Sequence, residues 1–175
     1  PRSTLSSSSA ASDVYKRQAM GETPSKAVKN ADFVMSCVGN DSDLLDITVG
    51  ENGAFSQMKK GSVFIDHTTV SAKVTEELYQ KSQTLGINFV DAPISGGQAG
   101  AENGVLSIMC GGDETDYARV EPILEVYSKI CRRIGFWCWA KDKNVQSNCY
   151  SWSSTGPFGG TSFCGKIWIG WSCGC

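Results

Sequence analysis

Short apolar runs alternate with helix-like segments along the middle of this 175-residue chain, over residues 19–135. Apolar runs of roughly four to eight residues, bounded by turn residues, are typical of strands that are buried on both faces. Strands that alternate with helices over most of this region predict an α/β fold, with a mostly parallel sheet and helices on both of its faces. Ligands bind such sheets beyond the carboxyl ends of the strands, so functional residues are expected there.

The boundaries of the expected elements follow from turn and capping residues. The expected strands cover residues 33–38, 62–66, 88–94, 105–110 and 130–134. The expected helices cover residues 24–31, 42–49, 72–85 and 113–128. Thr23 and Ser71 stand at the N-cap positions of two of these helices, and Gly86 stands at the position that ends the long one.

The first piece of the chain, residues 1–18, is rich in serine and has neither helical nor strand periodicity. Such polar stretches cannot bury enough surface to become ordered. Part of this piece, SSAASDVYKRQ, also resembles the translation of a sequencing adaptor. A segment of that origin carries no information about the fold of the protein. We therefore predict a non-native, disordered tail over residues 1–18.

The last piece, residues 136–175, contains all five tryptophans and five of the eight cysteines. Tryptophan has a single codon, and reading one base later turns every tryptophan codon into a glycine codon. The shifted reading of residues 136–148 then permits a glycine-containing motif followed by a regular helical pattern. The sequence therefore predicts a frameshifted tail that is disordered or irregular. A cysteine-rich metal module is the alternative, but Cys173 and Cys175 are too close for a usual zinc pair, and we expect no metal site.

Composition excludes two classes of partner. The formal net charge is −2, and no basic stripe marks one segment, so the chain lacks the electrostatic footprint of nucleic-acid binding. No apolar run approaches the roughly 20 residues of a membrane span. The cysteines outside the last piece, Cys37, Cys110 and Cys131, lie in apolar runs and are expected to be small, reduced core residues.

Polar residues follow the first two expected strands. Val38, Gly39 and Asn40 come after the first strand, where glycine allows close approach of a ligand to the backbone. By itself this segment is more typical of an ordinary strand-to-helix turn than of a ligand site. Two hydroxyls, one of them on Thr69, follow the second strand. His67 in the same segment is the only histidine, so it has no second histidine for a metal site and is interpreted as a loop residue.

The strongest local signal follows the third expected strand. Ser95, Gly96 and Gly97 place a hydroxyl and uncovered backbone N–H groups on one tight turn. A concave arrangement of N–H groups suits an anion, and a carboxylate in particular. The alternative, a flexible loop, is disfavoured by the ordered apolar residues on both sides. The sequence therefore predicts an anion-binding turn at the edge of a nucleotide-type sheet.

Three motifs in order give this chain a family resemblance. DAPISGGQAGAENGVLSIMCGGDE resembles the substrate-binding signature of the 3-hydroxyisobutyrate dehydrogenase and glyoxylate/succinic semialdehyde reductase group. VFIDHTTVSA and CVGND resemble the cofactor-side motifs of the same β-hydroxyacid dehydrogenase family, whose NADP-binding domain is of the 6-phosphogluconate dehydrogenase type. The resemblance covers residues 20–135 and identifies them as the C-terminal part of an NAD(P)-binding domain.

The resemblance implies a fold, a reaction and a set of site residues. In this family a Rossmann-type domain leads into a helical domain that completes the active site and dimerises, so the parent enzyme is expected to be a homo-oligomer. A hydride passes between NADP or NAD and a small carboxylate substrate, while a later lysine acts as general acid/base. Ser95, Gly96 and Gly97 correspond to the turn that holds the substrate carboxylate. The residues that correspond to the cofactor lining are Val38, Gly39, Asn40 and Thr69.

The sequence departs from the family pattern at both ends. The glycine-rich phosphate turn and the residue that selects NAD or NADP are expected before residue 19 and are absent. The family's lysine motif exists only in the shifted frame, and Lys143 has the wrong neighbours, so the catalytic residue stays unassigned. A non-catalytic NADP-binding or interaction module of the same fold is the alternative to an enzyme. The resemblance leaves open the choice among related semialdehyde substrates and between cytoplasm and mitochondrion.

We predict that the purified 175-residue chain has no dehydrogenase activity, because the phosphate turn and the lysine helix are both missing from it. The measurement is NAD(P)H absorbance with 3-hydroxyisobutyrate as substrate, and detectable turnover would contradict the prediction. The DNA sequence across codons 130–150 provides the companion test. A single inserted or deleted base there accounts for the tail, and an intact frame favours the non-catalytic alternative.

Overall fold

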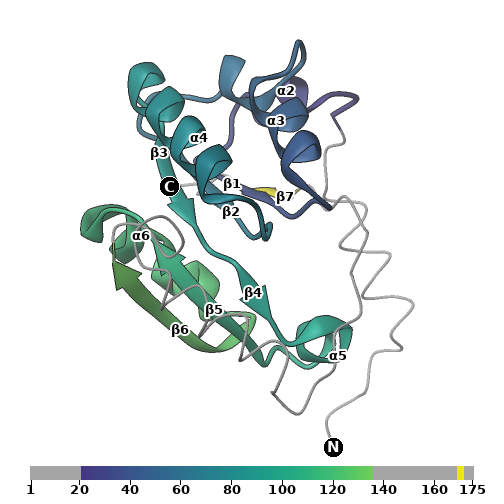
Figure 1. Cartoon of the computed structure of the whole chain (residues 1–175), viewed down its shortest axis with the longest axis vertical. Helices are drawn as coiled ribbons and strands as arrows, with labels where there is room; N and C mark the ends of the chain where they lie inside the picture. Colours follow the sequence, from purple (N-terminus) through teal and green to yellow (C-terminus); the bar gives the residue numbers. More distant parts are fainter. Residues whose placement is uncertain (1–20, 136–168, 172–175) are drawn as a thin grey trace, which may run out of the picture.

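The computed structural model describes residues 21–135 and the short strand at residues 169–171 (Figure 1). The predicted tails, residues 1–18 and 136–175, lie outside the described residues except for that strand. Within the described part, strands and helices alternate and build a sheet with helices on both faces. The α/β prediction is confirmed.

The strands are β1 (Phe33–Ser36), β2 (Val63–Asp66), β3 (Asn88–Asp91), β4 (Ile94–Ser95), β5 (Leu106–Gly111), β6 (Ser128–Gly135) and β7 (Ile169–Trp171). The helices are α2 (Pro24–Ala27), α3 (Asp41–Val49), the 3₁₀ turn η1 (Ala54–Ser56), α4 (Ala72–Leu85), α5 (Gly97–Glu102) and α6 (Glu114–Leu124). Most of these elements lie where the hydrophobic pattern and the turn residues predict them.

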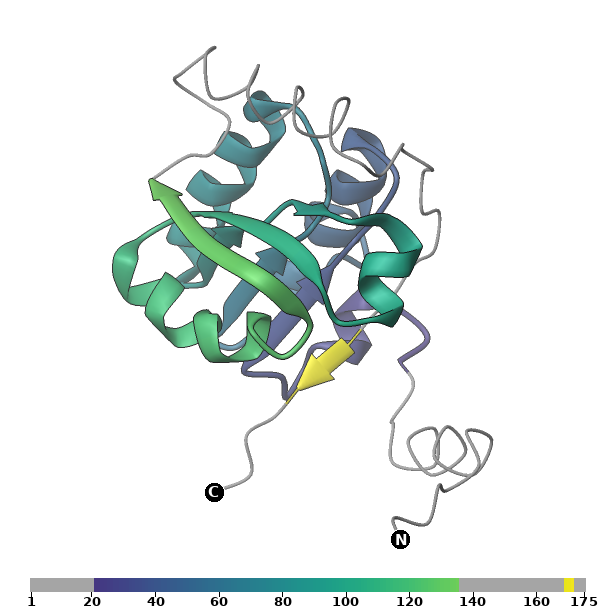
Figure 2. The same ribbon diagram turned by 90° about the horizontal axis from the view of Figure 1, so that it is seen from below.

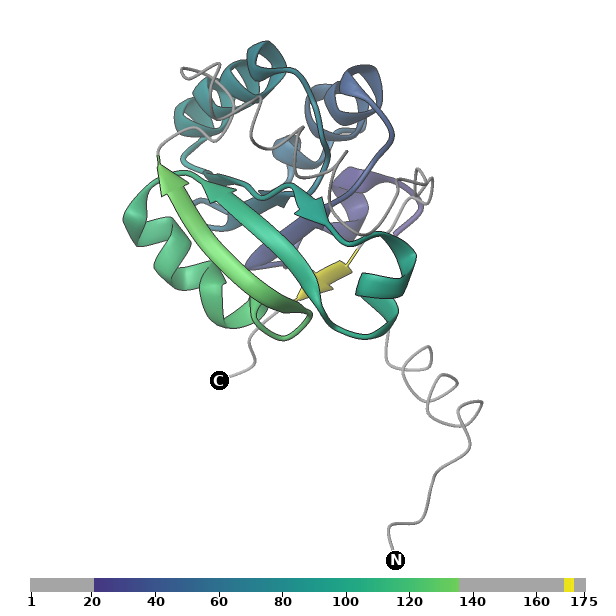
Figure 3. The same cartoon turned by 60° about the horizontal axis from the view of Figure 1, so that its bottom comes forward.

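The sheet has the strand order β4-β5-β3-β2-β1-β7, with β6 beside β5. Strands β1, β2 and β3 are parallel to one another, as are β5 and β6. Strand β5 runs antiparallel to β3 and β4, and β7 runs antiparallel to β1. Figures 2 and 3 show β6 running alongside β5, and α5 at the end of the β4–β5 hairpin. The longer ladders are parallel, so the sheet is mostly parallel, as predicted.

Helix ends are fixed by the residues that the sequence marks as caps. The hydroxyl of Thr23 accepts a hydrogen bond from the Lys26 N–H, and the hydroxyl of Ser71 accepts one from the Val74 N–H. Gly86 ends α4 with a φ of 72°, a left-handed conformation that glycine adopts without a steric cost. These caps satisfy N–H and C=O groups that have no partner within their own helices.

The structure differs from the expected boundaries in a few places. The strand expected over residues 88–94 is divided into β3 and β4, because Pro93 between them has no N–H with which to continue a ladder. The helices expected over residues 24–31 and 113–128 end earlier, at Ala27 and Leu124. Helix α5 was not predicted, since its glycine content lowers its intrinsic helix propensity.

Alternate residues of the central strands face two separate hydrophobic cores. Phe64 of β2 packs in one core with Leu78 of α4, on the face covered by α2, α3 and α4. Val63 and Ile65 of β2 pack in the other core, on the face covered by α6. Cys110 is fully buried in this second core, as predicted, whereas Cys37 and Cys131 are half-buried thiols.

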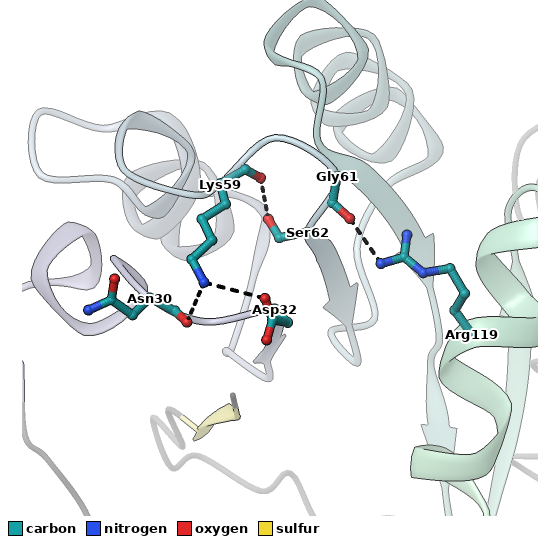
Figure 4. A network of polar contacts seen from close by, with 6 residues as sticks. All are labelled: Asn30, Asp32, Lys59, Gly61, Ser62 and Arg119. Atoms are coloured by element: carbon teal, nitrogen blue, oxygen red, sulfur yellow. Dashed lines mark hydrogen bonds and ion pairs between the residues drawn. The ribbon is translucent and has the colours of Figure 1, made fainter. Parts of the chain in front are cut away.

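Polar contacts at the amino end of β2 join elements from both faces of the sheet (Figure 4). The Lys59 ammonium donates to the Asn30 carbonyl over 3.0 Å and lies 3.4 Å from the Asp32 carboxylate. Arg119 of α6 donates to the Gly61 carbonyl over 2.9 Å. This network lies at the amino ends of the strands. The candidate site lies at the opposite end of the sheet, beyond the carboxyl ends of β1, β2 and β3.

We expect the two leucines of α4 to differ in their contribution to stability. Leu78 is fully buried, whereas Leu85 is 36% exposed. Leu78→Ala should lower the free energy of unfolding by about 2–5 kcal/mol through lost burial and a residual cavity. Leu85→Ala is the matched control and should cost less than about 1 kcal/mol. Urea unfolding under reducing conditions measures both, and equal costs would contradict the observed orientation of α4.

Candidate functional site

Three buried polar residues end the three parallel central strands. In the register of the sheet, Ser36 of β1 lies beside Asp66 of β2, and Asp66 lies beside Asp91 of β3. All three side chains are buried, with relative exposures of 2%, 1% and 1%. The segments that follow these strands therefore leave the sheet from one common edge.

Asp66 connects the ends of two strands to the loop that follows β2. One of its carboxylate oxygens accepts hydrogen bonds from the Ser36 hydroxyl over 2.9 Å and from the Thr68 N–H over 3.0 Å. The other oxygen is buried and has no hydrogen-bond partner among the described residues. Burial raises the pKa of Asp66 to about 6, although these hydrogen bonds act in the opposite direction. The ionised form of this carboxyl is therefore disfavoured in the folded chain.

Asp91 repeats this feature on the neighbouring strand. Its Oδ2 atom is also buried, and no residue in the described part of the chain bonds to it. Burial, and then the nearby Asp66 carboxylate, raise the pKa of Asp91 well above its ordinary value. A carboxyl in these surroundings is stable as the neutral acid, because two adjacent buried negative charges would repel each other. The carboxyls of Asp66 and Asp91 are therefore buried groups of the strand ends that are shielded from solvent.

The loop after β1 contains three of the predicted cofactor residues. The Val38 N–H donates to the Thr68 hydroxyl over 3.1 Å, which ties this loop to the loop after β2. Gly39 and Asn40 are exposed. The Asn40 side chain accepts from the Asp43 N–H over 3.0 Å and is the N-cap of α3. Asn40 therefore has a structural function at this helix end.

The loop after β2 contains Thr69, the fourth predicted cofactor residue, which is exposed. Its neighbour Thr68 is buried and makes the contact with Val38. At the end of the loop, Ser71 donates from its N–H and from its hydroxyl to the two carboxylate oxygens of Asp41, over 2.9 and 2.5 Å. The sequence analysis did not identify Thr68 and Asp41 as contacts, because only the folded sheet brings the two loops together.

His67 lies in the same loop, as interpreted from the sequence, but it is buried. Its Nδ1 atom lies 2.6 Å from the Ala92 carbonyl oxygen, and its Nε2 atom lies 2.9 Å from the Tyr127 hydroxyl. Burial lowers the pKa of the imidazole, despite the opposing effect of the Ala92 carbonyl. The imidazole is therefore held in its neutral form between two segments that are distant in sequence.

The predicted carboxylate turn begins in β4. Ser95 is half-buried and pairs with Ser107 of β5. Gly96 and Gly97 have φ values of 135° and 58°, in the region that favours glycine. A Cβ atom on Gly96 would lie 3.1 Å from Leu106, whereas one on Gly97 would meet no other part of the described chain within 4 Å. Helix α5 starts directly at Gly97, so N–H groups of its first turn lack partners within the helix.

Comparison with known protein families identifies the family to which this domain belongs. The profile described as the NAD binding domain of 6-phosphogluconate dehydrogenase matches residues 4–137, more than half of the chain. This chain belongs to that family. The family binds a nicotinamide dinucleotide, so NAD or NADP is the cofactor class, as predicted. The matched residues include most of residues 1–18, and the adaptor interpretation of that piece stays a prediction.

Individual relatives agree with this assignment. An uncharacterized oxidoreductase from Shewanella frigidimarina is 45% identical over 114 residues, covering 65% of this chain and 39% of the relative. The 2-hydroxy-3-oxopropionate reductase of Escherichia coli is 33% identical, with the same coverage of both chains. The solved 3-hydroxyisobutyrate dehydrogenase of Mycobacterium tuberculosis, with L-serine, is 25% identical with a TM-score of 0.67, covering 83% of this chain and 48% of that one.

The chain thus spans 39% of the length of these two curated relatives. Among the described residues, no group of three or more His, Cys, Asp or Glu side chains is placed to hold a metal ion. No helix in the described ranges has the length and apolar character needed to cross a membrane. Lys143 and the predicted lysine motif lie outside the described residues.

The buried carboxyl of Asp66 gives a prediction about pH and stability. Its folded pKa of about 6 lies above its ordinary value of 3.8, so the folded chain binds more protons than the unfolded chain between these values. Stability should therefore fall as the pH rises through this window. Asp66→Asn keeps an oxygen that can accept both hydrogen bonds, and it should raise stability at pH near 7.5 by up to about 3 kcal/mol. The gain should largely disappear at pH near 4, as urea unfolding at both pH values can measure.

Asp41→Asn is the matched control, with the opposite sign. Hydrogen bonds from Ser71 lower the pKa of the exposed Asp41 carboxyl, so its contribution is present above the ordinary pKa and is lost as the pH falls. This variant should lose stability at neutral pH. A loss of stability at neutral pH in Asp66→Asn as well would show that the Asp66 charge is not disfavoured by burial.

Proposed function

We propose that this chain carries the cofactor-facing and carboxylate-binding part of an NAD(P)-dependent dehydrogenase that acts on a small β-hydroxyacid or its semialdehyde. The observation that supports it is the register of β1, β2 and β3, which brings the segments after these strands to one edge. Two of those segments contain the proposed cofactor residues, and the third leads to the proposed carboxylate turn. The names of the relatives, a hydroxyisobutyrate dehydrogenase among them, favour this substrate class.

The open backbone after β1 fits a dinucleotide. Within residues 21–135, a Cβ atom on Gly39 would contact only the Asp43 carboxylate, at 3.4 Å, so a ligand can approach this backbone closely. We assign the contacts with NAD or NADP to Val38, Gly39, Asn40 and Thr69. The exposed positions of the last three residues leave them accessible to a ligand. When bound, the nicotinamide supplies or accepts the hydride.

The turn after β4 fits a carboxylate. The Ser95 hydroxyl and the N–H groups at the start of α5 are donors, and α5 itself adds the positive end of a short helix dipole. Apart from the adjoining backbone, no heavy atom of the described residues lies within 4 Å of a Cβ atom placed on Gly97, which leaves room for a carboxylate against the backbone. In this assignment Ser95, Gly96 and Gly97 orient the substrate through its acid group, so that the carbon bearing the hydroxyl faces the nicotinamide.

A substitution at Ser95 should weaken the binding of the carboxylate substrate more than the binding of the cofactor. Ser95→Leu places a bulky apolar side chain at the carboxylate turn and should raise the Kd of 3-hydroxyisobutyrate at least about tenfold, through the loss of a charge-assisted hydrogen bond. The Kd of NADP⁺ or NAD⁺ should change less than about twofold. Both are measured by NMR titration of the full chain at millimolar ligand, where weak binding is visible.

Ser56→Leu is the control for the added bulk, because Ser56 is exposed in η1 and outside the assigned site. It should leave both dissociation constants unchanged. Equal weakening of the two ligands in Ser95→Leu, or no carboxylate binding by the unsubstituted chain, would contradict the proposed function.

A further inference from the structure

His67 lies where three segments of the candidate site meet. It belongs to the loop after β2, beside Thr68 and Thr69, and is only 8% exposed. Its ring contacts Ala92, in the link between β3 and β4, and Tyr127, in the turn between α6 and β6. The imidazole and the Tyr127 ring also meet edge to face, with centroids 5.8 Å apart and an interplanar angle of 90°.

The partners of the two ring nitrogens determine which nitrogen carries the proton. A carbonyl oxygen can only accept, so Nδ1 must donate to the Ala92 carbonyl over 2.6 Å. In a neutral imidazole the other nitrogen is an acceptor, so the Tyr127 hydroxyl donates to Nε2 over 2.9 Å, a much shorter contact than its 3.9 Å approach to the Met35 sulfur. The hydrogen bonds therefore run in one direction, from Tyr127 through His67 to Ala92.

Ala92 is held on both sides, by the last residue of β2 and by the loop that follows it. Its N–H donates to the Asp66 carbonyl over 2.7 Å, and its carbonyl accepts from His67. Pro93 follows without an N–H of its own, and its carbonyl accepts from the Met109 N–H over 3.2 Å. The backbone then enters β4 and reaches Ser95 two residues later.

Tyr127 is anchored to the strand that supports the carboxylate turn. Its carbonyl accepts from the Leu106 N–H of β5 over 3.4 Å. The next residue, Ser107, is the register partner of Ser95. These contacts form a closed circuit. His67 holds Ala92, and the chain runs on from there to Ser95, which pairs with β5. Strand β5 in turn holds Tyr127, whose hydroxyl contacts His67.

We propose that His67 and Tyr127 are positioning residues that fix the turn at residues 95–97 relative to the cofactor loop after β2. The inference rests on the proposed function for the identity of the ligands, but the circuit itself is a property of the folded chain. Neither side chain is assigned a contact with substrate or cofactor. Their effect passes through Ala92, whose carbonyl needs the N–H of His67 as a donor.

The tautomer of His67 is the first test. His67 is the only histidine of the chain, so its two ring nitrogens give unambiguous ¹⁵N signals in NMR spectra of the full chain. We expect Nδ1 to have the signal of a protonated ring nitrogen and Nε2 that of an unprotonated acceptor. The opposite tautomer would overturn the proposal, because Nδ1 could not then donate to Ala92.

Tyr127→Phe is the second test, because it removes the hydroxyl and keeps the ring. We expect the amide signals of Gly96 and Gly97 to shift and the Kd of 3-hydroxyisobutyrate to rise about fivefold, as for one lost hydrogen bond. The Kd of NADP⁺ should stay within about twofold. Tyr117→Phe is the matched control, since its hydroxyl bonds to Glu121 of α6 and, over 3.4 Å, to the Cys131 carbonyl of β6 rather than to His67 or Ala92, and it should leave these signals in place.

Two substitutions of His67 distinguish its two hydrogen bonds, because each can retain one of them and removes the other. The amide nitrogen of Asn is placed near the position of Nδ1, and that of Gln near the position of Nε2. His67→Asn should therefore keep the bond to Ala92 and shift the Gly96 and Gly97 signals no more than Tyr127→Phe does, whereas His67→Gln, which loses that bond, should shift them further. Equal shifts in both variants, as from general loosening of the core, would overturn the proposal.

The outcomes also separate this inference from the proposed function. Without carboxylate binding by the unsubstituted chain, the proposed function fails, while the tautomer and the glycine amide signals still decide the positioning role. If the carboxylate binds and Tyr127→Phe leaves both its Kd and the glycine amide signals unchanged, the positioning role fails and the proposed function stands.

Discussion

The parallel register of β1, β2 and β3 is the constraint on which the candidate site depends. It sets Ser36, Asp66 and Asp91 side by side at the strand ends. Backbone hydrogen bonds define this register, and the two cores on either face of the sheet enforce it, because a shift by one residue would exchange the faces of Phe64 and its neighbours. Every proposed ligand contact lies in a segment that leaves one of these strands at this edge, or is reached through such a segment.

The strand ends combine packing with unfavourable electrostatics. Asp66 and Asp91 are buried, and each has a carboxylate oxygen without a hydrogen-bond partner. Burial of such groups costs stability unless they take up protons, and the raised pKa values of both carboxyls show that cost. Asp66 nevertheless joins β1 to the loop after β2, because it accepts hydrogen bonds from Ser36 and Thr68. His67 extends the same connection toward β4 through Ala92.

Family membership and site assignment have different support here. The profile match establishes an NAD-binding domain of the 6-phosphogluconate dehydrogenase type, and with it the cofactor class. The choice of substrate rests on the carboxylate turn at residues 95–97 and on the names of relatives whose length exceeds that of this chain. The proposed contacts of Ser95 and of Val38 are therefore assignments that the ligand titrations decide.

Local signals in the sequence determined much of the fold. The apolar runs predicted β1, β2 and β5, and Thr23, Ser71 and Gly86 marked helix ends, because periodicity and capping act over a few neighbouring residues. The same signals could not place α5, whose formation in a glycine-rich segment goes against local propensity.

The contacts of His67 were decided only by the tertiary structure. Taken alone, a single histidine in a polar loop gives no sign of burial. Its partners Ala92 and Tyr127 lie 25 and 60 residues away, and strand pairing brings them together. The sequence therefore determined which strands form and which residues follow them, because those are local properties of the chain. The sheet register and the packing of α6 decided which of these residues meet, because those contacts join segments that are distant along the chain.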